Sequence, residues 1–137
     1  MANADYNKYK EAIISGGANT NLSSGSVKVI LVDLADYPYS AAHEFLSDVP
    51  GAARVATSSA LSGKSVTSGV FDAADVTLST VSGDTSEAII LYIDTGVEAT
   101  SRLVAYIDTG VTGLPVTPSG SDINIVWDNG ANKIFAL

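Results

Sequence analysis

The chain has 137 residues, of which 46% are hydrophobic and 16% charged, and it carries a net charge of −8. This length predicts one domain, residues 1–137, with a single core, and the lack of Cys excludes disulfides, zinc–thiolate sites and thiol nucleophiles. We expect neither nucleic acid nor membrane as a partner, because nucleic-acid binding relies on Lys and Arg and the apolar runs are far shorter than the roughly 20 residues of a membrane-spanning helix.

The first predicted element is a short amphipathic helix over residues 5–15. The Gly pair at 16–17 ends it, since glycine readily adopts the conformation of a helix C-cap. The opening segment is polar and lacks the apolar stretch of a cleaved signal peptide. Apolar and aromatic residues recur at spacings of three and four along the helix: Tyr6, Tyr9, Ala12 and Ile13.

The rest of the chain has mainly β character. One further helical turn is predicted over residues 40–46, where Ser40 can cap it and Pro50 follows. About eight short segments are rich in β-branched or aromatic residues and bounded by turn formers. Because no long helix separates successive segments, we predict an antiparallel β-sandwich with a short N-terminal helix. The segments are 27–33, 54–61, 64–71, 75–78, 87–94, 103–108, 123–127 and 133–137.

One short sequence occurs twice. Residues 92–97 and 106–111 both read Tyr-Ile-Asp-Thr-Gly-Val. A solenoid needs several copies of its unit to bury a continuous core. We therefore interpret the two copies as neighbouring strands that end in similar Asp-Thr-Gly turns.

The single His belongs to no recognisable catalytic or metal-binding motif. His43 precedes Glu44, but a zinc-binding helix needs a second His four residues on, and position 47 is Ser. No Ser stands in the Gly-x-Ser-x-Gly elbow that supports a Ser-His-Asp triad. We expect His43 to be structural or to have no role, and we expect the protein not to be an enzyme.

Acidic residues near strand ends are expected to close turns through their side chains, rather than to form catalytic pairs. Residues 128–132 lack the terminal Glu of a calcium loop, and residues 62–65 lack the first Gly of a phosphate-binding loop. No catalytic, cofactor-binding or metal-binding residue is assigned. The Asp pairs considered are Asp33 with Asp36, Asp72 with Asp75, and Asp94 with Asp108.

Four tyrosines are candidate interface residues. Tyr37 and Tyr39 flank a proline in a predicted loop, where aromatic side chains are typical of interfaces, although burial under the sheet explains them equally well. Tyr6 and Tyr9 form a stripe on the predicted helix, which we expect to be exposed. Trp127 alternates with isoleucines along one strand and is predicted to lie in the core.

Several segments in chain order carry a family resemblance: Glu44-Phe45-Leu46-Ser47-Asp48-Val49-Pro50, Arg54-Val55-Ala56, Gly63-Lys64, Asp72-Ala73-Ala74-Asp75-Val76, 103–108 and 127–137. Taken together, these segments resemble small, acidic, β-rich virion proteins of tailed bacteriophages, which are encoded among head and tail genes. The resemblance covers most of the chain but includes no site motif, so it transfers no functional residue.

The resemblance implies a capsid decoration or cement protein. Such a protein binds the outer surface of the virion shell, often as a homotrimer, and stabilises contacts between major capsid subunits. An acidic protein outside the shell avoids repulsion by packed DNA, and a chain without Cys suits assembly in the host cytoplasm. The alternative is a tail or baseplate component that binds the host surface.

Overall fold

The computed structural model describes residues 3–137 and has a mainly β, antiparallel fold with one short α-helix near the N-terminus. Strands are numbered in chain order, and two 3-10 turns are labelled η1 and η2. The elements are β1 (Ala4–Asp5), α1 (Asn7–Ser15), β2 (Ser26–Val32), η1 (Leu46–Asp48), η2 (Gly51–Ala53), β3 (Arg54–Thr57), β4 (Ser65–Thr67), β5 (Val70–Asp72), β6 (Val76–Leu78), β7 (Ala88–Asp94), β8 (Arg102–Ile107), β9 (Ile123–Ile125) and β10 (Phe135–Ala136).

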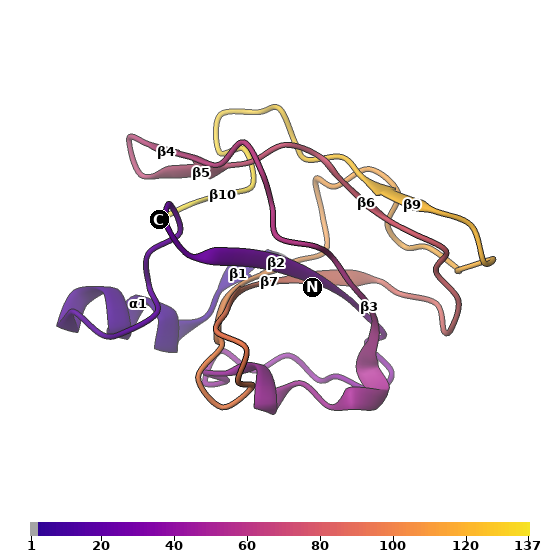
Figure 1. Cartoon of the computed structure of the whole chain (residues 1–137), viewed down its shortest axis with the longest axis horizontal. Helices are drawn as coiled ribbons and strands as arrows, with labels where there is room; N and C mark the ends of the chain where they lie inside the picture. Colours follow the sequence, from indigo (N-terminus) through magenta and orange to yellow (C-terminus); the bar gives the residue numbers. More distant parts are fainter. Residues whose placement is uncertain (1–2) are drawn as a thin grey trace.

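The strands form two layers. The larger is a five-stranded antiparallel sheet in the order β1-β8-β7-β2-β3. Two small sheets, β10-β5-β4 and β6-β9, lie over one face of it, and the loop that carries η1 and η2 lies on the other side (Figure 1). The predicted sandwich is therefore confirmed, with its second layer divided into two sheets.

The central strands β7 and β8 are buried on both faces. All six residues of β8 and six of the seven residues of β7 are buried. A strand buried on both faces is expected to be continuously apolar rather than alternating, and the run of residues 88–93 has that character. These strands form the middle of the core.

The N-terminal helix is confirmed, but it begins two residues later than predicted. Tyr9 and Ala12 are its buried residues, and Gly16 ends it in the left-handed conformation with φ of 71°. Asp5 instead belongs to β1, where it pairs with Ala105 of β8. A two-residue strand has no sequence pattern of its own and depends on its partner strand.

The helical turn predicted over residues 40–46 is wrong. The Leu46 N–H donates to Ser101 O at 2.8 Å, and Glu44 O accepts from the Leu103 N–H at 3.0 Å. Phe45 bridges to Arg102 between these bonds. This segment is therefore held along β8, and the short η1 and η2 turns follow it.

The segment 64–71, predicted as one strand, is a hairpin of β4 and β5. Ser68 and Gly69 both have positive φ, at 53° and 77°, and lie between the paired residues Thr67 and Val70. Two positive φ values in a two-residue loop are the pattern of a type I′ turn, which glycine favours. The chain therefore reverses where we expected it to continue.

The repeated hexapeptide lies on neighbouring strands, as predicted. It spans the ends of β7 and β8, which pair antiparallel, so the two Asp-Thr-Gly turns lie at opposite ends of the sheet. Gly96 and Gly110 take φ of 84° and 79°. In the first turn, the Gly96 N–H donates to Asp94 Oδ1 at 3.0 Å.

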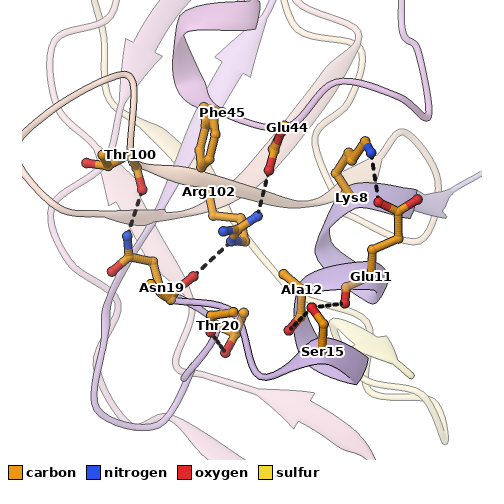
Figure 2. Close-up of polar contacts among 12 residues, drawn as sticks. Lys8, Glu11, Ala12, Ser15, Asn19, Thr20, Glu44, Phe45, Thr100 and Arg102 are labelled. Atoms are coloured by element: carbon orange, nitrogen blue, oxygen red, sulfur yellow. Dashed lines mark hydrogen bonds and ion pairs between the residues drawn. The ribbon is translucent and has the colours of Figure 1, made fainter.

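Buried Arg102, on β8, binds two loop segments to the five-stranded sheet (Figure 2). Its Nε donates to Ala18 O at 3.1 Å, and its Nη1 lies 3.3 Å from Glu44 Oε1. The guanidinium also lies 5.0 Å from the centre of the Phe45 ring, where a cation–π contact is favourable. One side chain thus joins the loop after α1 to the segment that precedes η1.

Candidate functional site

Three of the four tyrosines chosen as interface candidates lie in the interior. Tyr6, Tyr9 and Tyr37 are 0%, 2% and 1% exposed, and Tyr39 is partly exposed. The expected exposed stripe on the helix is wrong, because this face packs against the sheet, and the Tyr6 N–H donates to Val104 O at 3.0 Å. Tyr39 alone remains at the surface.

The buried phenols form a hydrogen-bonded chain with His43. The hydroxyls of Tyr6 and Tyr37 are 2.8 Å apart, and the Tyr37 hydroxyl is also 2.8 Å from His43 Nδ1. The Tyr39 ring lies between Tyr6 and Tyr106, with centroid distances of 5.3 and 4.9 Å. This cluster joins the N-cap residue of α1 to β8 and to the loop after β2, and it gives His43 a structural contact.

These phenols are protonated at neutral pH. Burial raises the pKa of Tyr37 to about 12 and that of Tyr9 to about 12, and it raises the pKa of Tyr6 further. The Tyr9 hydroxyl donates to Thr20 O at 3.2 Å. The geometry makes these groups hydrogen-bonding parts of the core, and a phenolate nucleophile is disfavoured at each position.

The structure brings Asp33 and Asp36 together and adds Asp84 from another loop. One carboxylate oxygen of each lies within 4.8 Å of the others. Asp33 Oδ1 also accepts from the Ala35 N–H at 2.8 Å, which is a turn contact, while Asp36 and Asp84 are exposed. Acidic groups at surface turns commonly cluster without a ligand, so we assign no metal here.

The other Asp pairs also have structural contacts. Asp94 lies 2.7 Å from Lys28 Nζ, and this hydrogen-bonded ion pair lowers the pKa of Asp94. Asp108 accepts from the Tyr106 hydroxyl at 3.2 Å, at the opposite end of the sheet from Asp94. Asp75 Oδ1 accepts from the Trp127 N–H at 3.0 Å, which fixes the C-terminal segment.

A polar cleft of about 680 Å³ opens between the N-terminal segment, the end of β8 and the C-terminal segment. Its size is in the range of small-molecule sites. Sequence reasoning missed it because its walls come from opposite ends of the chain. The polar and aromatic side chains that line it include Asp5, Lys10, Tyr39, Trp127, Asp128 and Lys133.

Lys10 and Lys133 differ from the other basic residues. Among residues 3–137, neither forms an ion pair or a side-chain hydrogen bond, whereas both Arg and the remaining Lys side chains do. Burial raises the pKa of Asp5, and the nearby Lys10 opposes this shift. The cleft thus presents ammonium groups, carboxylates and aromatic rings together.

An apolar groove of about 290 Å³ lies between α1, the loop after it and the β10-β5-β4 sheet. Val66 and Leu137, on its rim, are 52% and 59% exposed. No charged side chain lines it, although the whole chain has a net charge of −8. The lining includes Tyr9, Ile13, Leu22, Val66, Phe71, Phe135 and Leu137.

Within residues 3–137, no helix is both long and apolar enough to cross a membrane. The comparisons with known proteins give no relative from which a function could be taken: no family model and no curated protein matches the chain. The function is therefore argued from the surfaces above and from the sequence resemblance.

Proposed function

We propose that this protein is a structural component of a bacteriophage virion, most specifically a capsid decoration protein. It would bind the outside of the assembled shell and stabilise contacts between major capsid subunits. The sequence resemblance supports this proposal, and the net charge of −8 suits a surface that faces solvent rather than packed DNA. The role is one of binding, with no enzymatic step.

The observation that carries the proposal is the apolar groove beside β4. An open strand edge and exposed apolar side chains are both places where another polypeptide can bind. No charged side chain lines this groove, and β4 ends its sheet. A protein that coats a particle contacts the shell and its own neighbours, so an assembly surface of this kind is expected.

Repetition strengthens such contacts. A shell presents many identical sites, and a decoration protein that self-associates can engage several of them at once. The later contacts are then intramolecular, so weak individual contacts give a high apparent affinity. The homotrimer implied by the resemblance would act in this way.

The proposal is tested by co-sedimentation. The purified protein is mixed with preformed shells of the phage that encodes it, prepared without their native copies, and with unassembled capsid subunits in parallel. We expect saturable binding to shells and none to subunits. Pelleting with shells no greater than without them would overturn the proposal.

A second candidate function, a tail or baseplate component that binds host carbohydrate, is favoured by the polar cleft. Sugars are bound by hydrogen-bonding side chains beside aromatic rings, and this cleft offers both. Calorimetric titration with oligosaccharides released from the host cell surface would test it. Saturable binding that Lys133→Ala weakens, and that Lys8→Ala outside the cleft leaves unchanged, would support this function. Absence of heat at every oligosaccharide concentration would exclude it.

A further inference from the structure

β4 presents an open strand edge beside the groove. Ser65, Val66 and Thr67 are all exposed, and β4 is the last strand in the order β10-β5-β4. Among the described residues, the backbone of β4 pairs with β5 and with no other segment. An exposed edge of this kind is a template for another strand.

The hairpin register decides which backbone groups face outward. Thr67 and Val70 flank the two-residue turn and so form a hydrogen-bonded pair. Pairs alternate along an antiparallel ladder, so Val66 and Phe71 form the next, non-hydrogen-bonded pair. The N–H and C=O of Val66 therefore point away from β5, toward the open edge.

The side chain of Val66 adds apolar surface at the same position. Val66 lines the groove together with Phe71 and Phe135, whose rings pack with centroids 5.8 Å apart. A strand added beside β4 would place its own side chains next to Val66 and would extend this cluster.

We infer that two copies of this chain pair through their β4 strands, antiparallel and about a two-fold axis at Val66. The strand is complementary to itself in this register: Val66 faces Val66 of the partner subunit, and Ser65 faces Thr67 of the partner subunit. The two Val66 side chains thus lie opposite each other, as do the Ser and Thr hydroxyls, and no like charges face one another across the axis. The result is one continuous sheet across both copies, with the order β10-β5-β4 on each side of the axis.

The charge distribution favours a second copy of this chain, rather than a charged peptide, as the binding partner at β4. Two copies that each carry −8 repel one another over most of their surfaces, but the groove lining has no charged side chain. Lys64, the basic residue nearest to β4, already donates to Gly25 O. This face, whose groove has no charged side chain, is therefore a place where two acidic copies can approach closely.

A two-fold contact differs from the trimer that the resemblance implies. An isologous edge closes after two copies, because each edge is consumed by the other. The inference rests on the proposed function only in treating self-association as part of assembly, and it can be tested without any shell. If the copies do not pair, the inference fails; if the protein does not bind shells, the proposed function fails. The two outcomes are measured in separate experiments.

The test is the mass in solution, measured by sedimentation velocity over a wide range of protein concentration. The wild type is expected at twice the 14.0 kDa of one chain, at the higher concentrations. Val66→Pro removes the outward N–H, and edge strands tolerate proline at such positions, so this variant should remain folded by circular dichroism and monomeric. Val97→Lys is the matched control, because Val97 is 56% exposed in the β7–β8 loop, and it should dimerise like the wild type.

A charge exchange tests the register itself. Val66→Lys and Val66→Glu each place like charges opposite one another across the axis, so each variant alone should be monomeric. An equimolar mixture of the two variants should recover the dimer, because an ammonium group and a carboxylate then face each other across the axis. A wild type that is monomeric or trimeric at every concentration, single variants that still dimerise, or a mixture that stays monomeric would overturn the inference.

Discussion

Val66 lies directly opposite Phe71 in the β4–β5 hairpin, yet Val66 is 52% exposed and Phe71 is 2% exposed. The difference arises because β5 lies between β4 and β10 while β4 has a partner on one side only. The same hairpin thus has one strand in the core and one strand available for contact. Stability and assembly should be separable at these two positions.

Phe71→Ala should destabilise the fold, whereas Val66→Ala should not. Removal of a buried Phe costs about 3–5 kcal/mol, while truncation of a half-exposed edge Val should cost under about 1 kcal/mol. The measurement is urea unfolding at low protein concentration, where copies do not associate. Similar losses of free energy of unfolding at both positions would contradict this separation.

Arg102→Met should destabilise the protein by about 1–3 kcal/mol, since the variant removes charged hydrogen bonds from a largely buried position. Ala18 O would lose the guanidinium donor, and the Phe45 ring would lose its cation. Glu44 is more exposed than Arg102, so Glu44→Gln is the milder companion and should cost at most about 1 kcal/mol. The measurement is thermal unfolding of both variants. A larger loss of stability for Glu44→Gln than for Arg102→Met would contradict this ranking.

Tyr37→Phe should cost about 1–3 kcal/mol, because it leaves the buried Tyr6 hydroxyl and His43 Nδ1 without the group that joins them. Tyr39→Phe is the control: the Tyr39 ring packs between Tyr6 and Tyr106, and the same ring remains in the variant. Its cost should stay within about 0.5 kcal/mol. Equal effects of the two substitutions in chemical denaturation would argue against the hydrogen-bonded chain.

Alkaline pH should unfold the protein through its buried tyrosines. The unfolded pKa of Tyr is about 10, and burial raises the pKa of Tyr37 to about 12 in the folded state. A raised pKa means that the folded state binds the proton more tightly, so the stabilisation is complete below the unfolded pKa and is lost as pH rises from about 10 to 12. Ultraviolet absorbance should show phenolate formation together with unfolding. Complete ionisation while near-ultraviolet circular dichroism stays native would contradict this.

Local patterns predicted the elements that depend on local interactions. The helix combines an apolar face with a glycine C-cap, and β7 and β8 are long apolar runs. The prediction that Tyr6 and Tyr9 are exposed is wrong. A stripe at helical spacing identifies a face that packs against something, and here the sheet covers that face. Periodicity shows which residues share a face and does not show what that face meets.

Long-range contacts account for what the sequence did not reveal. β1 exists only as a partner of β8, and the segment around Phe45 is extended because it bonds to the backbone of β8. The polar cleft joins residues near both ends of the chain. The groove requires α1 and the β10-β5-β4 sheet to lie side by side. None of these arrangements has a signal within a short window of sequence.

The most direct measurement of the central claim is the copy number of this protein in purified virions, determined by quantitative mass spectrometry against the major capsid protein. A decoration protein must cover the shell, so we predict a copy number comparable to that of the major capsid protein and loss of the protein from particles that lack heads. A few copies per particle, retained on isolated tails, would contradict the decoration role and favour the tail component.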